Sequence, residues 1–296
     1  MNSNNINIAL ITDKNYFVPA MVTMKSMMNK TKRNLDVKCI LTEEVGLNTD
    51  ELAQELQNEF PHVKMEFVFF DDSLLKNVKT KFHVSRAAYV KIYLPEILSD
   101  WNKCIFLDSD LLIRKDIGQL WDIEMDKELG AVWNPGYNKD NEVMGLGMEE
   151  ETFNSGVLVM NLESMRMNNS SKALEIFIRD YNHLTHLNDQ AAFNAIYKRE
   201  WFHLPVEWNG QFLFYLRTSS KIGISKAEQK EMKKNPAIVH FTTSSKPWKY
   251  RSSHPFKKEF LSYFNTIPTA KYQGKVTIVD TLKRCREIFL LIKSNF

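Results

Sequence analysis

Two carboxylates, Asp108 and Asp110, interrupt an apolar run in the segment KCIFLDSDLLI at residues 103–113. Residues at positions i and i+2 of an extended chain project to the same face, so both carboxylates would point into one small volume and require a positive partner. Carboxylate oxygens suit Mg²⁺ or Mn²⁺, whose sites combine one or two protein carboxylates with substrate phosphates. The spacing therefore predicts a divalent-cation site. The alternative is a chance acidic pair, which is how we interpret Asp122 and Glu124.

Short β-rich runs alternate with helical patterns, and the two carboxylates follow one of these runs. Strands are expected at residues 6–11, 36–42, 63–70, 103–107, 130–133, 155–162 and 236–241, and helices at 18–30, 48–60, 171–182 and 188–197. This alternation predicts an α/β fold with a Rossmann-like, mostly parallel sheet and helices on both faces. Ligands of such sheets bind beyond the carboxyl ends of the strands, which is where Asp108 and Asp110 fall.

The composition is that of a soluble globular protein, with 44% hydrophobic and 25% charged residues in a chain of 296. The three cysteines, Cys39, Cys104 and Cys285, are far apart and have no metal-ligand spacing, which favours a reducing cytoplasm. The N-terminal residues do not resemble a signal peptide, and no apolar run is long enough to span a bilayer. We therefore expect a cytoplasmic protein.

Positive charge is concentrated at the C-terminus. Residues 246–296 contain eleven Lys or Arg and only three Asp or Glu, whereas the rest of the chain is acidic. We expect an α/β domain over residues 1–250 and a basic, partly helical extension over 251–296.

Residues 276–293 have helical spacing, with Ile278, Leu282, Cys285, Phe289 and Ile292 along one side. Such a helix suits an anionic membrane surface; the alternative is a helix packed on its own domain. Nucleic-acid binding is not expected, because no binding module accompanies the charge.

Six segments occur in the order typical of one enzyme family. They are ITDKNY (11–16), SRAAYVKIYLPEIL (85–98), KCIFLDSDLLI (103–113), FNSGVLVMNL (153–162), LNDQAAFN (187–194) and HFTTSSKPW (240–248). Together they resemble glycosyltransferase family 8, which includes bacterial lipopolysaccharide galactosyl- and glucosyltransferases and the glycogenins. The resemblance implies a GT-A fold, a divalent cation, a nucleotide-sugar donor and transfer with retention of anomeric configuration.

The resemblance also implies roles for individual residues. It makes Asp108, Asp110 and His240 the metal ligands, although a histidine after an apolar run is often only a packed structural residue. Lys246 would meet the donor diphosphate as charge grows on the leaving group. Asp189 would bind a sugar hydroxyl, and Gln190 would lie nearest the anomeric carbon and stabilise an oxocarbenium-like transition state. A helix start capped by Asn188 is a compatible structural interpretation of the same segment.

The remaining nucleotide-sugar contacts implied by the resemblance are Thr12, Asp13, Asn15, Tyr16, Lys91, Ser109, Asn134 and Asn154, with Asp108 serving both cation and donor. Asp13 and Asn15 would bond uracil or ribose and Tyr16 would stack, although Asp and Asn after a strand usually form a turn. Three positions depart from the family pattern. Lys91 aligns with an arginine, Thr243 with a glycine and Asn134 with a sugar-contacting aspartate, which leaves the transferred sugar open.

The function predicted is therefore a metal-dependent retaining glycosyltransferase. It would use Mn²⁺ or Mg²⁺ to move galactose or glucose from UDP-galactose or UDP-glucose to a glycan or glycolipid acceptor. Lipopolysaccharide or another bacterial surface glycan is the expected acceptor, at the cytoplasmic face of the inner membrane. Two alternatives remain open: a metal-dependent nucleotidyl or phosphoryl transferase, and a catalytically silent, membrane-peripheral protein that binds a nucleotide sugar.

Overall fold

The computed structural model describes residues 5–70, 87–135, 138–272 and 276–294, so Ser85 and Arg86 of the second family segment lie outside it. The chain forms two compact units, each made of separate stretches. Unit 1 consists of Met1–Asn15, Lys32–Asp108 and Gly118–Leu204, and unit 2 of Tyr16–Thr31, Ser109–Ile117 and Pro205–Phe296. Residues after 250 thus belong to unit 2 together with residues 205–250. The expected domain boundary at residue 250 remains a prediction.

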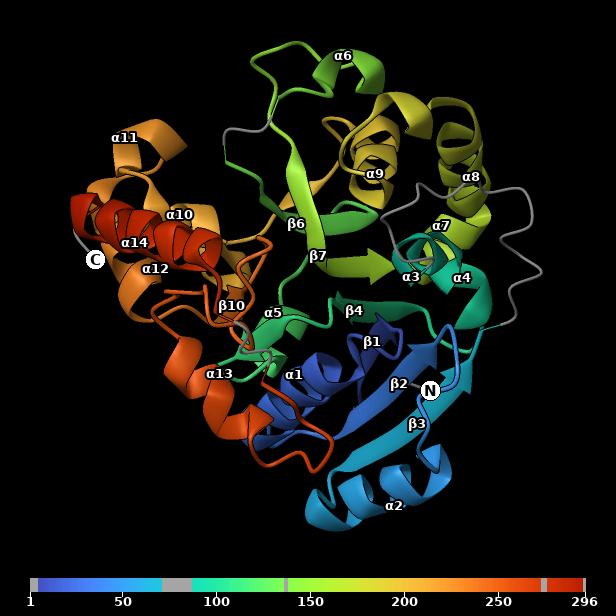
Figure 1. The fold of residues 1–296 in the computed structure, drawn as a ribbon. Helices are drawn as coiled ribbons and strands as arrows, with labels where there is room; N and C mark the ends of the chain where they lie inside the picture. Colours follow the sequence, from blue (N-terminus) through green and yellow to red (C-terminus); the bar gives the residue numbers. More distant parts are fainter. Residues whose placement is uncertain (1–4, 71–86, 136–137, 273–275, 295–296) are drawn as a thin grey trace. The chain divides into compact units, whose positions relative to one another are not determined.

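Unit 1 is built on a seven-stranded sheet with the order β3-β2-β1-β4-β7-β6-β8 (Figure 1). Its strands are β1 (Ile6–Thr12), β2 (Leu35–Leu41), β3 (Val63–Phe69), β4 (Lys103–Leu107), β6 (Leu129–Trp133), β7 (Phe153–Asn161) and β8 (Phe202–His203). Strands β3, β2, β1 and β4 run parallel, as do β6 and β8, whereas β7 is antiparallel to both of its neighbours. The predicted mostly parallel α/β sheet is confirmed. The predicted strand ends agree to within two residues.

The helices of unit 1 follow the strands along the chain. They are α2 (Thr49–Glu59), α3 (Ala87–Val90), α4 (Leu94–Ile97), α5 (Gly118–Trp121), α6 (Asn141–Met144), α7 (Leu162–Met167), α8 (Ser170–Tyr181) and α9 (Asp189–Tyr197), with the 3-10 turns η2 (Lys91–Tyr93) and η3 (Asn182–Leu184). Helix α2 begins where the Asn48 side chain accepts a hydrogen bond from the Glu51 N–H, which satisfies one of the free amides of its first turn.

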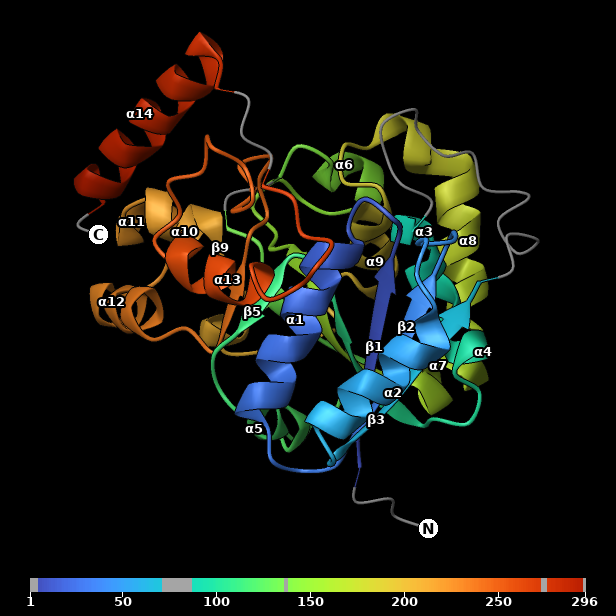
Figure 2. The ribbon, with the colours of Figure 1, turned by 60° about the horizontal axis from the view of Figure 1, so that its bottom comes forward.

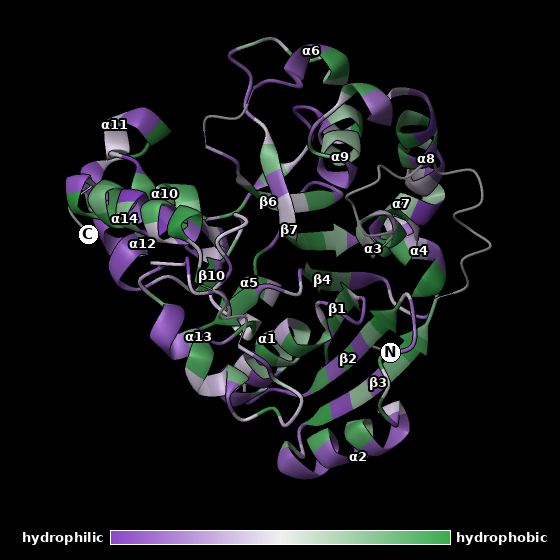
Figure 3. Ribbon diagram, viewed as in Figure 1, coloured by the Kyte–Doolittle hydropathy of each residue, from purple (hydrophilic) through white to green (hydrophobic). Residues whose placement is uncertain are grey.

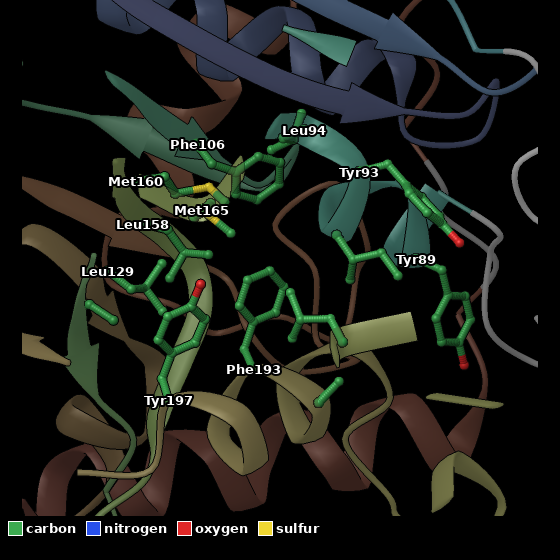
Figure 4. Packing of buried hydrophobic residues seen from close by; sticks show 14 of the residues in the cluster. Tyr89, Tyr93, Leu94, Phe106, Leu129, Leu158, Met160, Met165, Phe193 and Tyr197 are labelled. Atoms are coloured by element: carbon green, nitrogen blue, oxygen red, sulfur yellow. The ribbon is translucent and has the colours of Figure 1, made fainter. Parts of the chain in front are cut away.

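A buried apolar cluster fixes α9 against the sheet. Phe106 from β4 and Leu158 from β7 belong to the same cluster as Phe193 and Tyr197 from α9 (Figure 4). Full burial of a large apolar side chain contributes about 1.5–3 kcal/mol. Because Phe193 is buried completely, the first turn of α9, which carries Asp189 and Gln190, has a fixed position relative to β7.

Unit 2 contains a three-stranded sheet with the order β5-β10-β9. Strand β10 (Ile238–His240) is antiparallel to β5 (Leu111–Ile113) and parallel to β9 (Gly210–Gln211). A Cβ atom on Gly210 would lie 2.9 Å from the Ile238 carbonyl oxygen, so only glycine permits this approach of β9 to β10. Around the sheet lie α1 (Phe17–Lys30), α10 (Phe212–Leu216), α11 (Ser219–Ile222), α12 (Lys226–Lys234), α13 (Lys257–Phe264) and α14 (Ile278–Lys293), with the 3-10 turn η4 (Val206–Asn209).

Helix α1 holds the chain on both sides of Asp110. The Thr23 hydroxyl lies 3.1 Å from the carbonyl oxygens of Ser109 and Leu111, and it accepts a hydrogen bond from the Leu111 N–H. Because Thr23 is fully buried, these bonds are protected from water and fix the turn between β4 and β5. The Asp110 side chain therefore leaves a rigid segment of backbone.

The C-terminal helix α14 packs beside α10 (Figures 1 and 2), and most of its apolar stripe is exposed. Leu291 is buried, whereas Ile278, Leu282, Phe289 and Ile292 are 82%, 65%, 64% and 67% exposed. Figure 3 shows hydrophobic and hydrophilic residues following one another along α14. The stripe predicted from the sequence is therefore not packed on unit 2. None of the helices among the described residues is both long and apolar enough to cross a bilayer.

Candidate active site

The Lys91 side chain connects two acidic residues within unit 1. Its Nζ atom lies 3.0 Å from Asp189 Oδ2 and 3.4 Å from Asp108 Oδ1, and it donates a hydrogen bond to the Ser155 carbonyl oxygen at 2.8 Å. Burial alone would lower the pKa of Lys91, but the two carboxylates outweigh burial and raise that pKa. Lys91 is therefore a buried cation that neutralises charge at the end of β4.

The Gln190 amide is oriented by β7. Its Oε1 atom accepts hydrogen bonds from Asn154 Nδ2 at 2.9 Å and from the Ser155 N–H at 3.2 Å. Because a backbone N–H can only donate, the Ser155 contact fixes which end of the amide is the oxygen. Gln190 Nε2 is buried and has no hydrogen-bond partner among the described residues. The hydrogen-bonding atom of Gln190 that is left for a ligand is thus a donor.

Asp189 begins α9 and is held from two directions. Its Oδ2 atom accepts hydrogen bonds from Lys91 Nζ and from the Ser155 hydroxyl at 3.0 Å. The preceding residue, Asn188, has a positive φ of 51°, an unusual backbone conformation of the kind that concentrates at functional sites. Asn188 occupies the expected N-cap position but makes no capping hydrogen bond with its side chain. Unit 1 therefore brings the predicted residues Lys91, Asp108, Asp189, Asn154 and Gln190 into one network.

In unit 2, Asp110 contacts two other predicted site residues: His240, its expected co-ligand, and Lys246, which was expected to meet the donor diphosphate. Residue 240 pairs with Leu111 in the β5–β10 ladder, which brings His240 beside Asp110. His240 Nε2 lies 3.3 Å from Asp110 Oδ1, and the Lys246 ammonium donates a hydrogen bond to Asp110 Oδ2. Lys246 also donates to the Phe241 carbonyl oxygen at 2.6 Å. The segment HFTTSSK thus folds back so that both of its ends contact one carboxylate.

The two carboxylates of the DSD segment each have a cationic partner. Burial would raise the pKa of Asp110, but the charges of Lys246 and His240 hold the pKa of that carboxyl well below its usual range. Asp108 is paired with Lys91 in unit 1. The positive charge required by the spacing of these carboxylates is supplied by two lysines distant in sequence.

Asp108, Asp110 and His240 form a group that could hold a divalent cation. Asp108 precedes Asp110 by two residues on the same segment, and two carboxylates with one imidazole are donors that suit Mn²⁺ or Mg²⁺ better than a thiolate-binding metal. His240 Nδ1–H donates to Asn209 Oδ1 at 2.9 Å, and this bond orients the ring with Nε2 toward Asp110. The residues present therefore fit the predicted metal.

Sequence reasoning missed Asn209 and Ser155. Asn209 ends η4, and its contact with His240 joins positions 31 residues apart that no periodic pattern links. Ser155 lies inside the FNSGVLVMNL segment beside Asn154, so the segment itself was a signal, but its hydroxyl received no role. Asn209 thus positions His240, and Ser155 positions Lys91, Asp189 and Gln190 through several hydrogen bonds.

The predicted nucleotide-binding residues at the end of β1 lie in a turn. Thr12 and Asp13 are buried, and Asp13 Oδ1 accepts a hydrogen bond from the Asn15 N–H at 2.9 Å. This is the local turn that was the alternative to base recognition. In unit 2, the centroids of the Tyr16 and Trp248 rings lie 5.7 Å apart, and the rings meet edge to face. Trp248, which ends the KPW triplet, was not predicted as a site residue.

Ser109 and Asn134 are buried where strands end. The Ser109 carbonyl oxygen accepts the Thr23 hydroxyl hydrogen bond, and the Asn134 N–H donates to the Thr152 carbonyl oxygen at 2.7 Å. These hydrogen bonds hold the backbone in place at both residues. The roles of Thr12, Asp13, Asn15, Tyr16, Ser109 and Asn134 remain predictions.

Several known proteins are similar in sequence to this chain. General stress protein A of Bacillus subtilis is 30% identical over 210 residues, which cover 69% of this chain and 73% of that protein. Glycosyltransferase GlyF of Streptococcus pneumoniae is 23% identical over 242 residues, which cover 81% of this chain and 56% of that protein. The chain thus spans little more than half of GlyF.

Solved structures share the fold. The galactosyltransferase LgtC, in complex with donor and acceptor sugar analogs, matches with a TM-score of 0.75 and 20% identity over 94% of this chain and all of that chain. The bifunctional glycosyltransferase WbbM matches with a TM-score of 0.72 and 19% identity over 97% of this chain and 52% of that chain. The fold is therefore the GT-A fold expected from the sequence. Because residues 7–252 also match the sequence profile of Glycosyl transferase family 8, the chain belongs to that family.

Proposed function

We propose that this chain is a metal-dependent retaining hexosyltransferase that moves galactose or glucose from a UDP-sugar to a glycan acceptor. The observation that carries the proposal is the arrangement of Asp110, His240 and Lys246, because it combines cation ligands with a lysine that can neutralise a diphosphate. LgtC, a galactosyltransferase with the same fold, supports a galactosyl donor. Family membership supports glycosyl transfer as the reaction class.

A cation held by Asp108, Asp110 and His240 would neutralise the donor diphosphate, and Mn²⁺ or Mg²⁺ suits these ligands. Lys246 would then exchange Asp110 for the diphosphate, where it stabilises the charge that develops as UDP leaves. This interaction strengthens in the transition state, so it raises the turnover rate more than the affinity for the donor.

The sugar-binding role falls to the network around Gln190. We assign Gln190 Nε2, the donor without a partner among the described residues, to the phosphate oxygen that leaves the anomeric carbon, where it would stabilise the negative charge that develops in the oxocarbenium-like transition state. Asp189 would bind a sugar hydroxyl. Lys91 holds Asp189 in place and Asn154 holds Gln190 in place, and both could also contact the sugar. Retention follows if the acceptor attacks from the face that UDP leaves, with the departing phosphate accepting the acceptor proton.

The uridine end is assigned to Thr12, Asp13, Asn15 and Tyr16, with Ser109 and Asn134 contacting the rest of the donor. Tyr16 is 36% exposed, so part of its side chain is accessible to a nucleotide base. The Trp248 ring at its edge would hold Tyr16 in that orientation.

The exposed face of α14 supports peripheral association of the enzyme with a membrane surface. Ile278, Leu282, Phe289 and Ile292 present apolar surface, and basic residues such as Lys283 and Arg286 occupy the same helix. This pattern suits a helix that lies on anionic lipid, where the acceptor would be lipopolysaccharide or another surface glycan at the cytoplasmic face of the inner membrane.

The test is a screen of UDP-sugars with Mn²⁺ or Mg²⁺ that measures UDP release, free sugar and pyrophosphate. We expect UDP release and slow free-sugar formation with UDP-galactose or UDP-glucose, and neither in EDTA. Release of pyrophosphate or phosphate would instead identify a nucleotidyl or phosphoryl transferase. UDP binding without turnover of any UDP-sugar would identify a silent binding protein. Either result would overturn the proposal.

A further inference from the structure

A basic pocket of about 520 Å³ lies wholly within unit 2, lined by residues of α10, α11 and α14. The cationic residues that line it are Arg217, Lys221, Arg251, Lys283, Arg286 and Lys293, and the lining contains a single carboxylate, Glu287. Apolar residues such as Phe212 and Leu290 complete the wall. The volume is in the usual range for a small-molecule site.

The spacing of α14 builds one wall of this pocket. Lys283, Arg286, Leu290 and Lys293 recur every three or four residues, so they lie on one face of the helix, and all four line the pocket. The exposed apolar stripe of Leu282, Phe289 and Ile292 runs beside this face. The basic wall is therefore a continuous helix face.

The charges in the pocket are not neutralised by the protein. None of the six cations forms an ion pair with a carboxylate among the described residues, and Glu287 Oε2 instead accepts a hydrogen bond from the Ser253 N–H at 3.0 Å. Arg251 Nη2 donates to the Ser244 hydroxyl at 2.8 Å, but Arg251 Nε is buried without a partner in the described chain. A buried donor of this kind calls for a partner, and an anion would also relieve the repulsion between the cations.

The position of the pocket links it to the chemistry. Thr243 lines the pocket, three residues after His240 and three before Lys246. A larger pocket of about 1000 Å³, lined by lysines of α12, includes no residue of the 240–246 segment. One of its lysines, Lys233, already donates to the Ser294 carbonyl oxygen at 2.7 Å. The smaller pocket is therefore the better candidate for a substrate.

We propose that this pocket binds a phosphate ester carried by the acceptor, so that the acceptor of the transferase is anionic. Arginine forks and lysine ammonium groups are the side chains that recognise phosphate. The inference rests on the proposed function, which assigns Lys246 and the cation to the donor diphosphate and leaves these six cations for a second anion. The phosphate would belong either to a phosphorylated glycan or to a lipid headgroup.

The test compares two double variants of the full chain that change charge equally. Lys283→Glu with Arg286→Glu alters the proposed pocket, and Lys226→Glu with Lys230→Glu alters the larger pocket. Circular dichroism and melting temperature first establish that both variants fold. Calorimetry in EDTA then measures the binding of inorganic pyrophosphate. We expect at least tenfold weaker binding in the first variant and less than twofold weaker binding in the second.

Equal weakening in both variants, or no saturable binding to the wild-type chain, would overturn the inference. Competition separates the sources of phosphate: displacement of pyrophosphate by glucose 6-phosphate supports a phosphorylated glycan, and displacement by phosphatidylglycerol vesicles supports a lipid headgroup. If no UDP-sugar is turned over, the proposed function fails, but the pyrophosphate measurement still shows whether the pocket binds phosphate. If transfer occurs equally fast to phosphorylated and unphosphorylated disaccharides, the proposed function stands and the anionic acceptor is refuted.

Discussion

The Asn154 side chain donates a hydrogen bond from Nδ2 to Gln190 Oε1 at 2.9 Å, which joins β7 to the first turn of α9. This bond, together with the Ser155 N–H, occupies the amide oxygen and directs Gln190 Nε2 away from β7 as a buried donor. An amide oxygen that already accepts two hydrogen bonds is poorly available to stabilise positive charge. Catalysis by Gln190 is therefore expected to depend on its N–H group.

Substitutions of Gln190 separate the role of its amide oxygen from the role of its N–H donor. Gln190→Glu keeps oxygen atoms for Asn154 and Ser155 but removes the donor, so we expect kcat to fall about 100-fold, as for loss of one transition-state donor, with KM for the UDP-sugar changed little. Gln190→Ala should lose at least as much. Steady-state kinetics with the UDP-sugar found in the screen measures both. Near wild-type turnover in the glutamate variant would show that the donor is unimportant.

Lys91→Met tests the buried ion pairs of unit 1. Lys91 is 3% exposed, and its removal leaves Asp189 and Asp108 facing each other without a cation, so we expect the free energy of unfolding to fall by about 3 kcal/mol. Urea denaturation measures the change. Lys172→Met, which breaks an exposed ion pair with Glu175, is the control and should cost less than about 1 kcal/mol. Similar losses in the two variants would contradict this account.

His254 is expected to make stability depend on pH. Burial lowers the pKa of His254 to about 3, and its ring is packed against Phe212, Tyr215 and Phe241. In the unfolded chain its pKa is near 6.5, so below that pH the unfolded state binds a proton that the folded state does not, and stability falls as pH falls from 6.5 toward 3. The wild-type chain should lose about 2 kcal/mol more than His254→Gln between pH 7 and pH 5.

Urea titrations at several pH values provide that measurement. His183→Gln, which removes an exposed histidine, is the matched control and should leave the pH dependence unchanged. If His254→Gln has the same slope of unfolding free energy against pH as the wild-type chain, the buried neutral histidine is not the cause.

Local patterns predicted the elements that carry the site. The alternation of apolar runs and helical spacing identified β4 and α9, and the DSD segment marked the acidic end of β4. Such patterns depend on neighbours within a few residues, so they find strands, helices and the residues that end them. That is why the sequence alone could place Asp108, Asp110 and Gln190 at the ends of strands and helices.

Contacts between distant residues could not be predicted in the same way. Lys91 was expected to contact the nucleotide sugar, but its pairing with Asp189, 98 residues away, depends on how α9 packs on β7. Asn209 follows a tryptophan in a 3-10 turn and has no motif of its own. Its role emerges only because Gly210 lets β9 approach β10 and thereby brings Asn209 to His240.

Asn209 is expected to tune metal binding through His240. Asn209→Leu removes the acceptor of the His240 Nδ1–H group, so the imidazole loses its fixed orientation and Mn²⁺ should bind about 10–100-fold more weakly. Asn209→Asp keeps an acceptor oxygen and should retain most of the affinity. Paramagnetic resonance of free Mn²⁺ measures binding without substrate. Asn265→Leu, at an exposed position in the same unit, is the control. Unchanged Mn²⁺ affinity in Asn209→Leu would argue against His240 as a ligand.

The apolar stripe of α14 should determine membrane attachment. Leu282 and Phe289 are 65% and 64% exposed, so Leu282→Ser with Phe289→Ser removes apolar surface that would enter the bilayer without disturbing the buried Leu291. We expect binding to phosphatidylglycerol vesicles, measured by sedimentation, to fall at least tenfold. Met167→Ser, at a 77% exposed position on α7, is the control and should bind as the wild-type chain does.

Because basic residues of α14 would contact anionic lipid, 0.5 M salt should also weaken binding of the wild-type chain. Equal vesicle binding by the wild-type chain and the double variant would show that α14 does not attach the protein to lipid.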